Sequence, residues 1–361
     1  MSLHNLWLIG TKGTRNIVIS IVLPIFNIKK EELRDCFDSL QKQTLKDFEV
    51  LMVDDGSRPY VQEFCKSYAS QDTRFLYLAQ THSGVCAARN RGLDAAKGEY
   101  TCFVDPDDWV SERYLEALYG MMEKTGADIS IVDCQLHYKN RTVENHFLNI
   151  QETALQGKDK NCLLYQLFSR KLCDYYPPEL PAGTAWAKMF RTAFLKEKGL
   201  RFLKGLTRME DILFCMYAYE EANHIAYRQE SLYHYRVSEK SVSHCYDPDI
   251  VRNFEIFFYE SKQYLDHYQK GELLYHALAM RELTAVHSYL RLYYFRNPEL
   301  TRRRANQEID LLLAREPYYS AMKQIDRALL SRQEYVFVKA LQHRHYNLLR
   351  ALIRARELIK N

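Results

Sequence analysis

The first half of the sequence alternates short apolar runs with segments of helical period, and this alternation limits the possible folds more than any other feature. The apolar runs are rich in β-branched residues and have no polar face, which is typical of strands buried on both sides. They lie at 16–26, 48–57 and 99–105. Helical segments separate them, so the pattern predicts right-handed crossovers and a mainly parallel sheet with helices on both faces.

Acidic residues gather where these runs end. Asp54 and Asp55 follow the second run, and Asp105, Asp107 and Asp108 follow the third. Unpaired carboxylates repel each other and are costly to bury, whereas ligands of parallel sheets bind beyond the carboxyl ends of the strands. We therefore expect these carboxylates at the mouth of a cleft, where a cation neutralises them. The alternative is that they cap the helix expected from Ser111 or face solvent.

The Asp105-x-Asp107 spacing suits a hard divalent cation. Carboxylate oxygens hold Mg²⁺ or Mn²⁺, and such a metal keeps coordination positions open for diphosphate oxygens. The sequence has neither GxGxxG after the first run nor GxxxxGK[ST], which argues against a dinucleotide site and a P-loop. Nine cysteines without a CxxC pair predict reduced thiols and no zinc site.

Five segments of the chain resemble, in order, the motifs of family 2 glycosyltransferases of the bacterial polysaccharide or capsule type. The segments are SIVLPIFN, FEVLMVDDGS, SGVCAARNRGL, GEYTCFVDPDDWV and RMEDILF. The resemblance implies the GT-A fold, a nucleotide-sugar donor and inversion at the anomeric carbon. We expect a lead over 1–15, a GT-A domain over 16–244 and an all-helical C-terminal domain over 245–361, which lies outside the resemblance.

The resemblance also assigns roles in donor binding. The nucleoside pocket would use Pro24, Phe26, Asn27, Asp54 and Asp55. Gly84 and Arg89 would flank the nucleotide, with the Arg89 cation near the diphosphate, although Arg89 is also explained as a surface cation of a helix. Asp107 would be the direct metal ligand together with Asp105, and Asp108 would support the loop.

Glu210 and Asp211 begin an amphipathic helical segment and resemble the family's ED motif, in which the Asp is the catalytic base. An acceptor hydroxyl is a poor nucleophile, so a carboxylate within hydrogen-bond reach is needed to take its proton. Attack from the face opposite the leaving group inverts the anomeric centre. The alternative explanation is that acidic residues favour the positive end of a helix dipole.

Four further residues are weaker candidates. Trp186 would stack on an acceptor ring, although it equally suits a core position, and Lys188 lies with it just before the ED pair as a further substrate-binding candidate. Arg236 and His244 fall where the family often has a loop over the diphosphate, and they would contact phosphate or metal. A single His is equally explained as a structural residue.

The last segment predicts one basic amphipathic helix. Its apolar face would comprise Leu341, Leu348, Leu352, Ala355 and Ile359, with basic residues including Arg350 and Arg354 roughly opposite. Such a helix suits an anionic cytoplasmic leaflet, which predicts a cytoplasmic protein in peripheral contact with the inner face of the membrane. The alternative is that the apolar face packs on neighbouring helices. No RNA-recognition signature argues for a nucleic-acid partner.

The sequence thus predicts an inverting enzyme that moves a sugar from a UDP-sugar, with bound Mn²⁺ or Mg²⁺, to a hydroxyl of a glycan or lipid-linked glycan. One alternative is a sugar-nucleotide nucleotidyltransferase, which is expected to carry a glycine-rich loop that the segment 24–33 lacks. Another is a non-catalytic glycan-binding or scaffold protein on a transferase fold. The sequence does not identify the sugar, the acceptor, the linkage or the oligomeric state.

Overall fold

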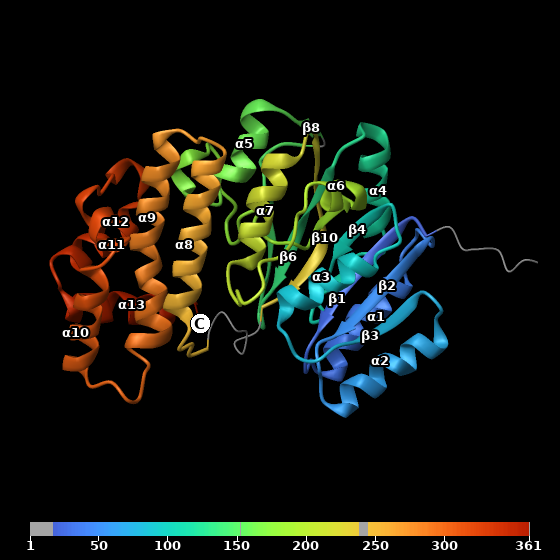
Figure 1. Ribbon diagram of the computed structural model, residues 1–361, viewed down its shortest axis with the longest axis horizontal. Coiled ribbons are helices and arrows are strands. Elements are labelled where there is room, and N and C mark those ends of the chain that lie inside the picture. The colour runs from blue at the N-terminus through green and yellow to red at the C-terminus, as the bar shows by residue number, and fades with distance from the viewer. Residues whose placement is uncertain (1–16, 152, 238–244, 361) are drawn as a thin grey trace, which may run out of the picture.

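A computed structural model describes residues 17–151, 153–237 and 245–360. Its centre is a ten-stranded sheet with the strand order β3-β2-β1-β4-β9-β6-β10-β5 and two further strands, β7 beside β6 and β8 beside β10 (Figure 1). The first four strands are parallel, and they are β1 (Ile19–Ile25), β2 (Phe48–Asp54), β3 (Phe75–Ala79) and β4 (Tyr100–Phe103). β1, β2 and β4 are buried along their whole length, as their apolar sequences predict.

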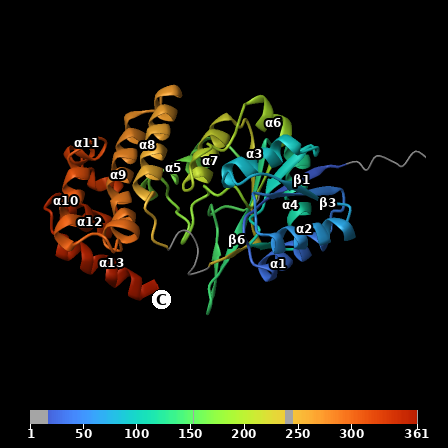
Figure 2. The same ribbon diagram turned by 60° about the horizontal axis from the view of Figure 1, so that its bottom comes forward.

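The order of the parallel strands sets the position of the ligand crevice. The chain steps from β1 to β2 to β3 in one direction, and α1 (Lys30–Gln41) and α2 (Pro59–Gln71) lie on one face of the sheet (Figure 2). It then returns past β1 to β4, and the connecting helix α3 (Val85–Ala95) lies on the opposite face. The reversal falls between β1 and β4, and a crevice forms beyond the carboxyl ends of such strands.

The second half of the sheet is mixed. Its strands are β5 (Trp109–Val110), β6 (Ile129–His137), β7 (Thr142–Asn145), β8 (Thr153–Leu155), β9 (Lys188–Arg191) and β10 (Ile225–Arg236). β9 runs antiparallel between β4 and β6, whereas β10 runs parallel to β6. Its helices are α4 (Tyr114–Thr125), α5 (Gly157–Tyr165), α6 (Thr192–Glu197) and α7 (Glu210–Glu221). The second half therefore adds α7, whose first turn carries the ED pair.

The start of one helix differs from the expectation. α4 begins after Arg113 rather than on Ser111. It ends before Gly126, which takes the left-handed conformation that favours glycine after a helix. α3 begins after Gly84, and the Ser83 hydroxyl before it bonds to the Thr81 carbonyl.

Only helices follow residue 245 in the described part of the chain. They are α8 (Ile250–His267), α9 (Glu272–Tyr289), α10 (Arg302–Leu313), α11 (Tyr318–Lys323), α12 (Arg332–Gln342) and α13 (Tyr346–Lys360). In Figure 1 these orange to red helices lie to one side of the sheet, with α8 next to α7. The predicted fold class, an α/β sheet domain with an all-helical extension, is confirmed.

The single C-terminal helix predicted from the sequence is wrong. α12 ends at Gln342, Arg344 takes a positive φ of 59°, and α13 begins at Tyr346. This break changes which residues face inward, because the helical period restarts after it. Leu341 is buried, as expected of the apolar face, but Leu348 is 44% exposed.

The buried side of α13 is a different set of residues, Tyr346, Leu349 and Ile353. Ala355, which was expected on the apolar face, is exposed, and the side chain of Ile359 lies outside the described residues. α13 therefore packs inward through residues that the predicted stripe did not include.

Arg350 lies on the protein rather than facing outward to lipid. It donates to Asn306 Oδ1 at 2.8 Å, and its guanidinium lies 4.3 Å from the centre of the Phe295 ring. This packing removes one of the basic residues that the membrane hypothesis required. Within the described ranges, no helix is both long enough and apolar enough to cross a bilayer.

We expect Glu282 to make the stability of the helical extension pH-dependent. This carboxyl is 8% exposed on α9, and burial raises its pKa to about 8, against the opposing effect of Lys262. The unfolded chain ionises it near its usual pKa, so stability falls as pH rises from about 4.5 to 8, at about 1.4 kcal/mol per unit of pKa difference. Glu282→Gln should therefore raise the melting temperature at pH 9 and change it little at pH 5. An equal gain at both pH values would contradict this.

Candidate active site

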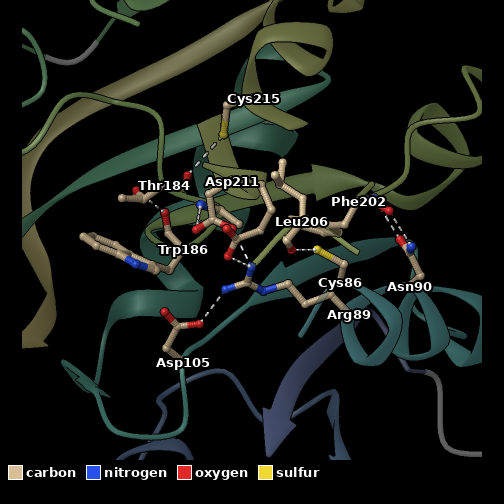
Figure 3. A network of polar contacts seen from close by, with 12 residues as sticks. Cys86, Arg89, Asn90, Asp105, Thr184, Trp186, Phe202, Leu206, Asp211 and Cys215 are labelled. Carbon is tan, nitrogen blue, oxygen red and sulfur yellow. Dashed lines mark hydrogen bonds and ion pairs between the residues drawn. The ribbon is translucent and has the colours of Figure 1, made fainter. Parts of the chain in front are cut away.

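Arg89 connects the two acidic motifs. Its guanidinium donates to Asp105 Oδ1 at 2.9 Å, to Asp211 Oδ1 at 2.5 Å and to Glu210 Oε1 at 3.3 Å (Figure 3). Arg89 is 3% exposed and its guanidinium also lies 5.1 Å from the centre of the Phe202 ring. One buried cation therefore brings the Asp-x-Asp loop and the ED pair, which are about a hundred residues apart in sequence, to a single place.

Three elements meet at this cation. Arg89 is on α3, Asp105 follows β4, and Glu210 and Asp211 form the first turn of α7. Met209, which precedes that turn, takes a left-handed conformation with φ of 63°, an unusual one for a residue with a side chain. The Ala185 amide donates to Asp211 Oδ2 at 3.1 Å. Asp211 is thus held at both carboxylate oxygens, with a lone pair of Oδ2 left for a further donor.

The electrostatics of the ED pair suit a base that works near neutral pH. Burial raises the pKa of Asp211 above its ordinary value, against the opposing effect of Arg89. Burial and the neighbouring Asp211 charge raise the pKa of Glu210 to about 7. A carboxylate is a stronger base when its pKa is raised. The positive charge of Arg89 opposes that rise and so favours the ionised form of both carboxyl groups.

The Asp-x-Asp loop holds one carboxylate that is bonded within the protein and one that is not. Asp105 is bonded to Arg89, whereas no hydrogen bond or ion pair of the Asp107 carboxylate is found among the described residues. Burial and the Asp105 charge raise the pKa of Asp107 to about 6. A cation at Asp107 would relieve this. The described residues contain no cluster of three or more His, Cys, Asp or Glu arranged for a metal, so protein ligands alone do not complete a site.

Asp108 supports the loop, as expected. It is fully buried, accepting a hydrogen bond from the Tyr233 hydroxyl at 2.8 Å and one from the Arg236 amide at 2.7 Å. The Asp105 amide in turn donates to the Tyr233 oxygen at 3.1 Å. The loop is therefore fastened to β10, which fixes where the Asp107 carboxylate lies.

Among the residues expected in the nucleoside pocket, Phe26 offers an exposed ring, whereas Pro24 and Asn27 serve the structure of the strand and its loop. Phe26 is 42% exposed at the end of β1 and is accessible to a ligand. Pro24 is buried within β1, beyond the last residue of that strand that pairs with β4, so its missing amide costs no hydrogen bond there. Asn27 takes a φ of 52° and its side-chain oxygen accepts from the Arg58 amide, which ties the loop after β1 to the loop after β2.

Asp54 and Asp55 are both buried but bind different parts of the chain. Asp54 accepts from the Ser57 amide at 2.9 Å and the Tyr77 hydroxyl at 2.5 Å, so it holds its own turn together. Asp55, 2% exposed, accepts from the Ser83 and Gly84 amides, both at 2.8 Å, and so holds the start of α3. Gly84 has φ of 88° and ψ of 163°, which a residue with a Cβ rarely adopts.

Trp186 and Lys188 do not lie where they were expected. Trp186 is 3% exposed and stacks on Tyr233, with ring centres 4.4 Å apart, so it has no free face for an acceptor ring. Lys188 is fully buried and its ammonium donates to the Thr184 carbonyl at 2.7 Å and the Trp186 carbonyl at 3.3 Å. Both are core residues that shape the 184–188 loop, which carries the Ala185 amide to Asp211.

Arg236 is also engaged within the protein. Its guanidinium donates to Asp35 Oδ2 at 2.7 Å and to the Asp107 carbonyl at 2.9 Å, and it lies 4.8 Å from the centre of the Trp109 ring. It braces the Asp-x-Asp loop against α1 instead of pointing to a diphosphate. The prediction for His244 lies outside the described residues.

Several residues of the site were not found by sequence reasoning. Tyr233, Ala185 and Asp35 act through tertiary contacts and have no motif of their own. The helical extension also reaches the site, because the half-buried Arg281 of α9 donates to the Leu167 carbonyl and contacts Met209 Sδ at 3.8 Å, directly before the ED pair. Only the Tyr-x-x-Arg segment beginning at Tyr233 offered a signal, through its polar residues at a strand end.

Comparisons with known proteins identify the family of the sheet domain. A family model described as Glycosyl transferase family 2 matches residues 20–197. EpsH of Bacillus subtilis is 28% identical over 241 residues, which cover 65% of this chain and 65% of that protein. The glycosyltransferase GlyA of Streptococcus pneumoniae is 30% identical over 230 residues, or 62% of this chain and 31% of that protein. The aligned region thus spans less than two thirds of the length of either relative.

Among solved structures, S. aureus TarS 1-349 in complex with UDP-GlcNAc aligns with a TM-score of 0.63 at 18% identity, covering 95% of this chain and 92% of that one. At this identity the likeness establishes the fold, which includes the helices after the sheet. The match to the family model includes β1, β2, α3, β4 and the Asp-x-Asp loop, whereas α7 with the ED pair lies beyond it. Residues 20–197 therefore form a family 2 glycosyltransferase domain, and the chain has the GT-A fold.

Proposed function

We propose that the chain transfers a sugar from a UDP-sugar to a hydroxyl of a glycan or lipid-linked glycan, with inversion. The observation that carries this proposal is the Arg89 bridge between Asp105 and Asp211. Direct displacement needs a group that stabilises the departing diphosphate and a base on the opposite side of the sugar. The bridge holds Asp105, which with Asp107 would bind the metal, and Asp211, the proposed base, within the reach of a single guanidinium. The UDP-GlcNAc bound by TarS supports the choice of a UDP-linked donor.

The nucleobase of the sugar donor would lie on the ring of Phe26, next to Asp55. Phe26 offers an exposed aromatic ring, and the Asp55 carboxylate is a suitable acceptor for a base N–H. Gly84 allows the backbone to come close to the nucleotide at the start of α3. Asp55 and Gly84 lie together because Asp55 binds the Gly84 amide directly, and Phe26 lies near them because its ring stacks on His82, which contacts Asp55.

The residues at the Asp-x-Asp loop fit a divalent cation, Mn²⁺ or Mg²⁺. Two carboxylates that leave most coordination positions for diphosphate and water match the usual habit of Mg²⁺, and the pKa of Asp107, raised to about 6, marks a buried charge in need of a cation. When bound, the metal would stabilise the negative charge of the departing UDP. Asp107 is the residue we assign to it, with Asp105 shared between the metal and Arg89.

The chain's own residues would supply the rest of the reaction. Asp211 Oδ2 takes the proton of the acceptor hydroxyl as the oxygen attacks the anomeric carbon. The Ala185 amide and Arg89 orient the carboxylate, and Arg89 keeps it ionised against the effect of burial. Trp186 and Lys188 act indirectly, by packing the loop that presents Ala185.

The proposal is tested with a panel of nucleotide sugars and Mn²⁺, scored for transfer and for slow donor hydrolysis. A UDP-sugar should be turned over, and the variant Asp211→Asn should not turn it over. Binding of a UDP-sugar without turnover by the unmodified chain would support the scaffold alternative. Release of pyrophosphate from a nucleoside triphosphate and a sugar phosphate would support the nucleotidyltransferase.

We expect Asp107→Asn to abolish metal-dependent binding of UDP while the fold remains intact. The Asn side chain lacks the negative charge that attracts the cation. Loss of a residue that only supports a metal ligand lowers metal affinity ~10–100-fold, so loss of a ligand itself should lower it at least as much. Calorimetry with UDP and Mn²⁺ measures it. Asp94→Asn is the control, because Asp94 is an exposed carboxylate that pairs with Arg201 and is not part of the Asp-x-Asp loop or its contacts. Equal UDP affinity of Asp107→Asn and the unmodified chain in Mn²⁺ would remove Asp107 from the metal site.

A further inference from the structure

The ring of His82 already makes the contacts that we assign to the nucleobase of the donor. It stacks on Phe26 with ring centres 4.1 Å apart and an angle of 20° between the planes. Its Nδ1 lies 2.9 Å from Asp55 Oδ2 and 3.1 Å from the Asp55 backbone oxygen, and since both oxygens accept, Nδ1 carries the proton. A flat ring with an N–H is thus placed on the aromatic side chain and against the carboxylate of the proposed nucleoside pocket.

Asp55 has little capacity left for another donor. Its Oδ1 accepts from the Ser83 amide at 2.8 Å and from Gln80 Nε2 at 2.6 Å. Its Oδ2 accepts from the Gly84 amide at 2.8 Å and lies 2.9 Å from His82 Nδ1, whose N–H is shared with the Asp55 backbone oxygen. The two amides belong to the backbone at the start of α3 and stay in place. A base can therefore reach this carboxylate in full only when a side chain withdraws.

His82 is the side chain that is free to withdraw. It is 56% exposed in the short connection between β3 and α3, whereas Gln80 is only partly exposed. Rotating the imidazole into solvent breaks the stack with Phe26 and the bond to Asp55 but disturbs no core packing. The two rings are in contact, so no third ring fits between them while His82 remains.

We propose that His82 is an internal occupant of the nucleobase subsite, which the donor base must displace. This inference rests on the proposed donor pocket and adds a residue that tunes its affinity and its choice of base. A base is retained only when its stacking and its hydrogen bond to Asp55 exceed those of the imidazole. A pyrimidine with an N–H beside its carbonyl groups offers both contacts, a flat ring for Phe26 and a donor for Asp55.

The expected effect follows from the population of the open subsite. The apparent dissociation constant equals the intrinsic one divided by the open fraction, so a ring that occupies the subsite in nine of ten molecules weakens binding about tenfold. His82→Ala removes the competitor while it leaves Phe26 and both backbone donors to Asp55 in place. It should therefore bind UDP several-fold more tightly than the unmodified chain.

The experiment compares dissociation constants of UDP, uridine and pyrophosphate, measured by calorimetry in Mn²⁺, for the unmodified chain and three variants. His82→Ala should strengthen binding of UDP and uridine by the same factor and leave pyrophosphate unchanged. Thr81→Ala, an exposed neighbour in the same connection, is the matched control and should change nothing. Phe26→Ala should weaken UDP and uridine, which tests the pocket itself.

The outcomes distinguish failure of the His82 proposal from failure of the proposed donor pocket on which it rests. If Phe26→Ala binds UDP as the unmodified chain does, the proposed donor pocket is wrong. If Phe26→Ala weakens binding but His82→Ala leaves it equal or weaker, the pocket stands and the internal occupant does not. Imidazole signals in ¹³C,¹⁵N-histidine-labelled protein give a second measurement. The His82 signals, identified by their absence in His82→Ala, should move toward those of a solvent-exposed ring when uridine is added, and unchanged signals would overturn the inference.

Discussion

Asp211→Asn should keep the affinity for UDP and lose transfer by ~10²–10⁴-fold, the usual contribution of a general base. The amide oxygen still accepts from Arg89, but the amide nitrogen then faces the Ala185 N–H and has no lone pair for the acceptor proton. The donor pocket is built from other residues, so binding of UDP in Mn²⁺ should change little. Initial rates and calorimetry on the same preparation measure both quantities.

Glu210→Gln is the matched control for this prediction. Glu210 is the adjacent residue of α7 and shares Arg89, at 3.3 Å, but it does not bind the Ala185 amide. It should retain most of its transfer activity. Loss of activity in Glu210→Gln with normal rates in Asp211→Asn would exchange their roles, and collapse of UDP binding in Asp211→Asn would make Asp211 a binding residue. A product with retained anomeric configuration would contradict direct displacement altogether.

The sequence predicted the strands, the edge of the sheet where ligands bind and the acidic residues there, because each depends on local pattern. A buried strand has a recognisable composition, and parallel strands place their carboxyl ends at one edge. Asp55, Asp105, Asp107 and Asp211 are therefore brought to the same region, as expected. Their individual environments were not predictable, because a carboxylate that faces a ligand and one that faces a backbone amide are identical in sequence.

Positively charged and aromatic residues show this limit most clearly. Arg89, Lys188 and Arg236 were each assigned to ligand, yet all three are engaged by carboxylates or carbonyls of the protein. Their partners lie 16 to more than 200 residues away, or in the bend of a single loop, so no spacing rule connects them. The C-terminal helix was misjudged for a related reason, since one residue with positive φ at Arg344 restarts the period that the prediction extended.

Arg89→Met should cost about 3–5 kcal/mol of stability, the range seen when one partner of a buried charge network is removed. Asp105, Glu210 and Asp211 would then share a site with no cation. Burial already raises the pKa of Glu210 and Asp211, and removal of the opposing charge of Arg89 raises both further. The carboxyl groups of the folded variant take up protons that the unfolded chain releases, so the loss of stability should grow as pH rises from 5 to 8. Urea denaturation at both pH values measures it.

Arg201→Met is the control for loss of a cation alone. Arg201 pairs with Asp94 at 2.9 Å, but both side chains are well exposed, so this change should cost no more than about 1 kcal/mol. Similar losses in the two variants would mean that the Arg89 network does not hold the motifs together. Arg89→Lys separates charge from geometry, because one ammonium cannot span Asp105 and Asp211 as a guanidinium does.

Activity in Arg89→Lys should reveal the second role of the guanidinium. A lysine that pairs with only one of the two carboxylates leaves the other at a higher pKa, and an Asp211 that is protonated at neutral pH cannot accept the hydroxyl proton. The acidic limb of the pH–rate profile should therefore move to higher pH, with transfer partly restored in alkaline buffer. An unshifted profile with a uniformly lower rate would mean that Arg89 only positions the base, and that the ionisation of Asp211 is governed by its burial and by the Ala185 amide.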